Sequence, residues 1–350
     1  MEPSNVTELA VEKPARHDAI LVTEEMLSYF TMINTWGIGQ CVTILGLIVN
    51  GLNIVVFVKQ GVKDSVNISL LGLSISDFGS LFFHFFANLC WTPSIMKMDL
   101  PFYPHHLMYY LVWEHIMFTR VTTGTTAWIT FERCLCIVAP LKIKSIVTPR
   151  RTVTFIVALY VIMMSSVTPM FYTTRIGWMF DSRRNKSLLG VYKIANTGDI
   201  EKATFWSNNI LPTIFFVFIT ICTIILVKAL KKNAKWRGKT ASSQKNEGVS
   251  SRDTKVVKMV TIISAVFISC YAPGTVVYIF LLVYPQMSYR GRQRNLLVAI
   301  FSILIHLEGI NATANFFIYL TMSSKFKCTF RNMFCIGYRD LKEGSDNNVA

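Results

Sequence analysis

The stretch Ile129–Leu141, ITFERCLCIVAPL, places an acid and a base, Glu132 and Arg133, at the end of a long apolar run. The run begins at Leu111, so it is long enough to cross the hydrocarbon core of a bilayer, which is roughly 30 Å thick. Ions at this depth are costly unless they are paired, which suggests a pair at the inner mouth of a helix bundle. A pair that merely snorkels to the membrane surface would give the same local pattern, and the rest of the chain has to distinguish the two.

The composition of the chain is that of a membrane protein. The 350 residues are 52% hydrophobic and 16% charged, with a mean hydropathy of +0.42, whereas soluble domains carry about 25% charged residues. Seven apolar stretches of about 20 residues or more can each span a bilayer. They lie at residues 36–58, 67–91, 105–138, 151–173, 204–231, 254–284 and 295–321. We therefore predict an all-α membrane protein, a seven-transmembrane helix bundle.

Lysine and arginine are unevenly distributed between the two sides of this predicted bundle. Of the 35 such residues, 21 lie in the first, third and fifth loops and the tail, against 12 on the other side. Because cytoplasmic segments are enriched in these residues, we expect residues 1–35 outside, residues 36–321 in the bundle and residues 322–350 in the cytoplasm. Orientation and contact with membrane lipids thus explain the net charge of +15, and no nucleic-acid partner is expected.

Two N-glycosylation sequons agree with this orientation, because Asn5 and Asn185 both fall on the predicted outer side. Residues 1–35 lack the basic start and apolar stretch of a signal peptide, so the first span is expected to direct insertion. None of the eight cysteines falls in the middle of an outer loop. A bond between Cys41 and Cys90 stays open, although buried membrane thiols are usually free.

The segment SSKFKCTFRNMF, residues 323–334, predicts a short amphipathic eighth helix on the inner leaflet. Phe326, Phe330 and Phe334 recur at a spacing of four residues, with basic residues between them. Cys328 and Cys335 are candidates for acylation at this surface.

Asp77 stands alone in an apolar run of the second predicted span. An intramembrane carboxylate is a candidate functional group by default, and it is expected to face the bundle interior. A neutral, hydrogen-bonded acid with a purely structural role is the alternative interpretation.

Arg120 and Glu308 lie at similar depths in the third and seventh predicted spans. Arg120 is 13 residues outward of Arg133, roughly 20 Å of helix, and Glu308 is 11 residues outward of Tyr319, roughly 16 Å. The two side chains either pair with each other or hold a ligand, with Arg120 on a carboxylate and Glu308 on an amine. His115, a turn or so above, is more often a structural hydrogen-bond donor than a ligand contact in such a place.

Two other classes of membrane protein find little support in the sequence. A transporter would show broken helices or inverted repeats, which we do not find. A membrane enzyme would need a nucleophile or a metal, and the histidines do not stand at metal-ligand spacing, so no enzyme activity is expected. They are residues 17, 84, 105, 106, 115 and 306.

The motifs, taken together and in order, resemble those of a rhodopsin-type (class A) G-protein-coupled receptor over about residues 36–335. The matching residues are Asn50, Asp77, Glu132-Arg133-Cys134 with Pro140-Leu141, Cys270-Tyr271-Ala272-Pro273, and Asn315-Phe316-Phe317-Ile318-Tyr319. Segments such as KQGVKDSVNISLLGLSISDFGSL and TFERCLCIVAPLK are most similar to the chemosensory receptors of gastropod molluscs. Neuropeptide receptors of invertebrates are the nearest alternative.

This resemblance implies a receptor of the plasma membrane that binds an extracellular small molecule or peptide and activates a heterotrimeric G protein. It implies that Arg133 pairs with Glu132 and Asp253 at rest, and that activation also involves Phe267, Pro273, Asn315 and Tyr319. The ligand would lie in the outer half of the bundle, near Arg120, Glu308, His115, Thr119 and Tyr271. A sodium ion would lie among Asp77, Thr122, Asn311 and Asn315, where the sequence alone permits only a hydrated polar cluster.

The sequence also departs from the pattern of that family. Residues 100–116 and 175–203 contain no cysteine, so the family's outer disulfide cannot form. Tyr271 stands where the family has a tryptophan, and Phe316 stands where it has a proline. These departures bear on signalling behaviour and not on the fold.

Overall fold

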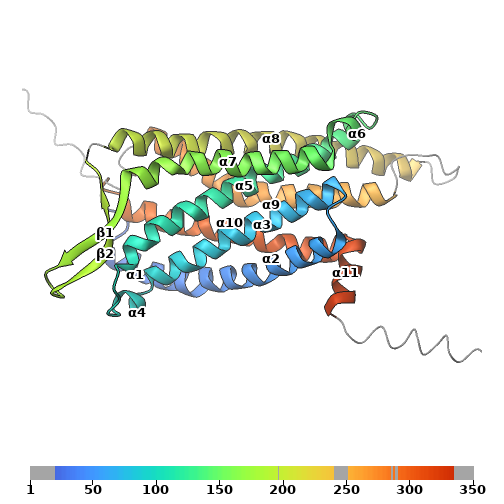
Figure 1. Ribbon diagram of the computed structural model, residues 1–350. Helices are drawn as coiled ribbons and strands as arrows, with labels where there is room; N and C mark the ends of the chain where they lie inside the picture. The colour runs from blue at the N-terminus through green and yellow to red at the C-terminus, as the bar shows by residue number, and fades with distance from the viewer. Residues whose placement is uncertain (1–19, 196, 240–250, 285–286, 288–290, 335–350) are drawn as a thin grey trace, which may run out of the picture.

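The computed structural model (Figure 1) describes residues 20–334 apart from 196, 240–250, 285–286 and 288–290. Within them, seven long helical segments run side by side, as the sequence predicts. The first joins α1 (Glu24–Thr31), a π-helical stretch (Met32–Gly39) and α2 (Gln40–Gln60), and it is followed by α3 (Ser65–Trp91), α5 (Pro104–Val138), α7 (Pro149–Thr173), α8 (Gly198–Lys239), α9 (Ser251–Val283) and α10 (Arg294–Met322).

The bundle is built around α5, which differs from the other six segments in composition. The other six are long and apolar enough to cross a membrane, whereas threonines and charged residues interrupt the apolar run of α5. This helix packs against α3, α7, α8 and α9, and every residue from Thr119 to Ala127 is buried. A helix buried on all sides can carry polar side chains inside a membrane, because they meet protein and not lipid.

The remaining elements lie at the two ends of the bundle (Figure 1). The hairpin of β1 (Thr174–Asp181) and β2 (Lys186–Lys193) lies at one end with α4 (Pro93–Met96), and α6 (Ile143–Ile146) and α11 (Ser324–Phe334) lie at the other. Proline at the first turn begins α4, α5 and α7, where its missing N–H has no helical partner to lose.

The first helix begins at Glu24, twelve residues before the predicted span. Its start is tied to the start of α10, because the amide of Leu21 donates to Gln293 and the side chain of Asn295 donates to the carbonyl of Val22. Part of the predicted outer segment 1–35 is therefore helical. Cys41 and Cys90 are separate thiols, so the bond between them is not formed.

The β1–β2 hairpin was not expected from the polar and basic sequence of residues 175–203. Leu189 of β2 exchanges backbone hydrogen bonds with Pro101 and Tyr103, which fixes the hairpin to the preceding outer loop. Lys186 also donates to Asp99, and this hydrogen bond holds the pKa of the Asp99 carboxyl below its usual range. Such pairings join segments far apart in the chain, so a local pattern does not reveal them.

At the opposite end, α11 packs its predicted apolar face against the bundle. Phe326 is fully buried, with ring centroids 5.3 Å from Phe57 and 5.6 Å from Tyr319. Phe330 continues the same face, whereas Phe334 is 45% exposed. The predicted eighth helix is thus confirmed, and its first phenylalanine anchors it.

We expect Phe326→Ala to lower the free energy of unfolding by about 3–5 kcal/mol, the usual loss for a buried phenylalanine. Thermal unfolding of the detergent-purified protein would measure it. Phe334→Ala on the same helix is the matched control and should change stability by less than about 1 kcal/mol, because its ring is already exposed. Equal losses in the two variants would contradict the assignment of Phe326 as the anchor.

Candidate functional site

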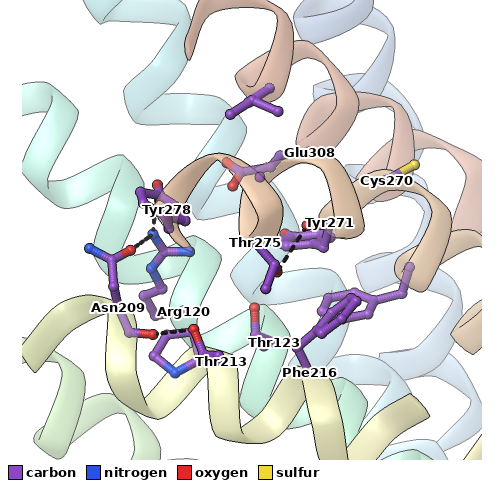
Figure 2. A pocket seen from close by; sticks show the side chains of 14 residues that line it. Arg120, Thr123, Asn209, Thr213, Phe216, Cys270, Tyr271, Thr275, Tyr278 and Glu308 are labelled. Carbon is purple, nitrogen blue, oxygen red and sulfur yellow. Dashed lines mark hydrogen bonds between the residues drawn. The ribbon is translucent and has the colours of Figure 1, made fainter. Parts of the chain in front are cut away.

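A pocket that is partly open to solvent lies between α5, α8, α9 and α10 (Figure 2). It contains two of the predicted charged ligand contacts, Arg120 and Glu308, and the predicted contact Tyr271. His115 and Thr119 do not line it. The lining residues are Arg120, Thr123, Asn209, Pro212, Thr213, Phe216, Phe267, Cys270, Tyr271, Gly274, Thr275, Tyr278, Leu304 and Glu308.

Arg120 is buried, and its direct partners are neutral. Its Nη2 donates to the side-chain oxygen of Asn209 at 3.3 Å and to the hydroxyl of Tyr278 at 3.4 Å, whose ring centroid lies 5.9 Å from the guanidinium carbon. Its Nε is buried and has no hydrogen-bond partner among the described residues. Asn209 and Tyr278 were missed by the sequence analysis, because nothing in their local sequence marks them as partners of a charge on α5.

Glu308 does not pair directly with Arg120, so the interpretation of these residues as an ion pair is wrong. The basic group nearest to its carboxylate, among the described residues, is the imidazole of His115, whose Nε2 lies 3.6 Å away. Similar depth along two helices did not determine the partner, because the rotation of each helix about its own axis decides which side chains meet.

His115 belongs to a polar network that joins α3 to α5. Its Nδ1 lies 2.9 Å from the hydroxyl and 3.0 Å from the carbonyl oxygen of Ser80, and the same hydroxyl lies 2.9 Å from that of Thr119. The ring of His84 lies 4.9 Å from the ring of His115 and accepts a hydrogen bond from Asn88. The sequence analysis missed Ser80, His84 and Asn88, although polar residues in an apolar span are a usable signal.

Tyr271 forms the wall of the pocket on α9 and stacks on Phe267. Their ring centroids are 4.1 Å apart with an interplanar angle of 19°. Phe267 is fully buried and packs with Ala127 of α5 and Ile219 of α8. Tyr271 therefore connects the pocket to the packing between α5, α8 and α9. Helix α9 continues through Pro273, two residues further on.

Asp77 is surrounded by polar groups from two other helices. Its carboxylate accepts a hydrogen bond from Thr122 at 2.8 Å and one from Asn315 at 2.9 Å. The side-chain oxygens of Asn311 and Asn315 are buried and accept no hydrogen bond among the described residues. Three of the four residues predicted to hold a sodium ion are thus brought together, and Asn311 lies one turn before Asn315.

The carboxylate of Glu132 is held mainly by hydroxyl groups. It is fully buried and accepts hydrogen bonds from Ser65 and Ser69 of α3 and from Thr152 of α7, whereas Arg133 lies 3.9 Å away. The three hydroxyl donors were missed by the sequence analysis. The side chain of Asp253, the other predicted partner of Arg133, lies outside the described residues.

A second link at this depth joins α5 to α9. The hydroxyls of Thr130 and Ser264 are both fully buried and lie 2.8 Å apart. Three of the predicted activation residues, Phe267, Asn315 and Tyr319, are buried inside the bundle.

Comparison with known proteins agrees with the seven-helix arrangement. Residues 38–337 match the family described as serpentine type 7TM GPCR chemoreceptor Srw. The chain is also similar to an allatostatin-A receptor of Bombyx mori, at 22% identity over 307 residues that cover 83% of this chain and 77% of that receptor. A probable G-protein coupled receptor of Caenorhabditis elegans, AH9.1, is 24% identical over 203 residues, covering 53% of this chain and 47% of that protein.

These matches confirm the class of protein that the motifs resemble, a multi-pass membrane receptor. The finer resemblance to rhodopsin-type receptors of gastropod molluscs stays a prediction. Because the family match covers most of the chain, the chain belongs to the Srw family of serpentine seven-transmembrane chemoreceptors, which are G-protein-coupled receptors.

Proposed function

We propose that the chain is a chemosensory receptor of the plasma membrane with its N-terminus outside, and that it activates a heterotrimeric G protein. Its ligand binds in the pocket between α5, α8, α9 and α10. The observation that supports this most is the stack of Tyr271 on Phe267, because it places a wall of the pocket in contact with the core between three helices.

Activation proceeds through displacement of the inner half of α9. A ligand against Tyr271 shifts the aromatic stack, and the hydrogen bond between Thr130 and Ser264 is lost as α9 moves away from α5. The cytoplasmic cleft that opens is bordered by Arg133, with Glu132 and Asp253 as its resting-state partners. The shift needs only a ligand that binds the moved arrangement more tightly than the resting one.

A sodium ion beside Asp77 fits the residues present. Carboxylate, hydroxyl and amide oxygens are the ligands that a hard cation prefers. The side-chain oxygens of Asn311 and Asn315 are buried, and no group in the described part of the chain donates to them. Asp77, Thr122 and Asn315 would hold the ion together with Asn311 and water. The ion would stabilise the resting arrangement of α3, α5 and α10.

A neuropeptide ligand is the second candidate, supported by the similarity to the allatostatin-A receptor of Bombyx mori. A peptide would extend from the pocket toward the β1–β2 hairpin, where Trp178 and Phe180 are 71% and 67% exposed. The transporter alternative has lost its basis, because the matched family consists of receptors.

The function is tested by nucleotide exchange on purified G proteins of each class, stimulated by the receptor in membranes. Ser264→Ala should raise the ligand-independent exchange rate up to about fivefold, because a hydrogen bond worth about 1 kcal/mol no longer holds α9 against α5. Ser269→Ala on the same helix is the control and should have no effect, because its exposed hydroxyl bonds only to its own helix.

Arg133→Ala should abolish the stimulation in both backgrounds at matched receptor levels. Absence of exchange with every G-protein class, in the wild type and in Ser264→Ala alike, would contradict coupling to a G protein.

The orientation is tested by the glycan on Asn185, which is exposed at the turn of the hairpin. In cells expressing an Asn5→Gln background, Asn185→Gln should remove a glycan, seen as a faster band that deglycosylase treatment no longer shifts. Asn67→Gln is the matched control, because its sequon is buried in α3. A shift with Asn67→Gln and none with Asn185→Gln would place the hairpin inside the cell.

The sodium site is tested by thermal unfolding in sodium chloride and in choline chloride at equal ionic strength. Sodium should stabilise the wild type, and Asp77→Asn should remove this difference because the ion loses its charged ligand. Ser74→Ala, which deletes a buried hydroxyl bonded to its own helix, should keep it. A sodium effect of the same size in Asp77→Asn would place the ion elsewhere.

A further inference from the structure

We propose that the pocket takes an organic anion whose carboxylate binds Arg120, and that Glu308 is not an anchor for a ligand amine. This inference rests on the proposed function only in taking the pocket as the ligand site. It follows from where the protons of His115 lie, and hence from which charge in the pocket is left without a counter-charge.

The hydrogen bonds around Ser80 fix a proton on the Nδ1 of His115. Thr119 donates its single hydroxyl proton to the carbonyl of His115, so it can only accept from Ser80. Ser80 thereby uses its own proton and can only accept from the Nδ1 of His115. The carbonyl oxygen of Ser80, 3.0 Å from the same nitrogen, is also an acceptor only.

With a proton on Nδ1, a neutral His115 would turn the bare lone pair of Nε2 toward the carboxylate of Glu308, 3.6 Å away. Two acceptors facing each other repel, so this geometry favours a proton on one of the two groups, although the atoms are too far apart to form a hydrogen bond. The pair is then either two opposite charges or two neutral groups. In both cases Glu308 and His115 together contribute no net charge to the pocket.

The neighbouring ring does not alter this balance. His84, whose ring centroid lies 4.9 Å from that of His115, accepts an amide N–H of Asn88 at its Nε2. A ring nitrogen that accepts belongs to a neutral imidazole. Among the charged groups that line the pocket in the described part of the chain, Arg120 is the one whose direct hydrogen-bond partners are all neutral.

Arg120 also has the free donors that an anion requires. Its hydrogen bonds to described residues come from Nη2, and its buried Nε has no partner. A guanidinium presents its N–H groups in a planar fork that matches the two oxygens of a carboxylate. A buried charge without a direct ion-pair partner is costly, and a ligand carboxylate would lower that cost on binding.

The other residues that line the pocket indicate the chemical character of the rest of the ligand. Phe216, Tyr271 and Leu304 line the pocket with apolar surface, and Thr123, Thr213 and Thr275 bring hydroxyl groups. Thr213 and Thr275 already donate to carbonyls of their own helices. An apolar body carrying one carboxylate suits this lining better than a second charged group.

The test is binding of 3-phenylpropionate to the whole purified receptor in detergent, followed by thermal unfolding. 3-Phenylpropanamide, 3-phenylpropylamine and phenylalanine are matched in body and differ in charge. At about 10 mM, the acid should raise Tm by at least about 2 °C, and the amide and the amine should not. Phenylalanine should raise it less than the acid does, because its ammonium meets no net negative charge.

Variants separate the two charged residues. Arg120→Gln should remove the advantage of the acid over the amide, whereas Glu308→Gln should keep it, since it replaces one neutral arrangement by another. Arg120→Lys keeps the positive charge but loses the planar guanidinium, so it should prefer the acid over the amide less strongly than the wild type does. This variant replaces Arg120→Gln in the test if Arg120→Gln does not fold.

The proposal would be overturned if the acid and the amide shifted the wild type equally, or if neither did. It would also fail if phenylalanine shifted Tm most and Glu308→Gln removed that shift, which would indicate a zwitterionic ligand. Persistence of the preference in Arg120→Gln would move the anion to another residue. Binding is measured without a G protein, so loss of coupling alone would contradict the proposed function and leave this inference standing.

Discussion

Lipid offers no hydrogen bonds, so every polar group in the membrane-spanning part of the chain needs a partner within the protein. The buried carboxylate of Glu132 shows how this constraint organises the bundle. Ser65, Ser69 and Thr152 reach it from α3 and α7, and the pairing joins three helices at one point. Because the buried carboxylate of Glu132 would otherwise lack donors, these hydrogen bonds favour the rotation of α3, α5 and α7 that brings the three hydroxyls to it.

The same constraint makes α5 the centre of the molecule and the place where function concentrates. Its buried threonines and charged residues lie between four other helices, so a displacement of α5 alters its packing against all four. The pocket lies beside this helix (Figure 2), and Phe267, on which Tyr271 stacks, packs against Ala127 of the same helix. A ligand that binds Arg120 therefore acts at the element that already connects the rest of the bundle.

Several buried polar groups in the described part of the chain lack a hydrogen-bond partner, and some of them lie at the two proposed binding sites. Among the described residues, the Nε of Arg120 and the side-chain oxygens of Asn311 and Asn315 are buried without hydrogen-bond partners, while most buried polar groups in proteins have one. The first lies at the pocket and the others lie beside Asp77. Unpartnered groups at these two places are consistent with binding of an anion at one and of a cation at the other.

The sequence by itself determined the seven spans, the amphipathic helix with Phe326, and the polar residues expected inside the bundle, because hydropathy and helical periodicity are local properties of the chain. It did not determine the partners of those residues. Glu308 meets His115 and not Arg120, Glu132 is held by hydroxyls, and residues 174–193 form a hairpin. Only the tertiary structure decided these pairings, because they depend on how each helix is rotated and shifted against its neighbours, which a few residues on either side of a charge do not specify.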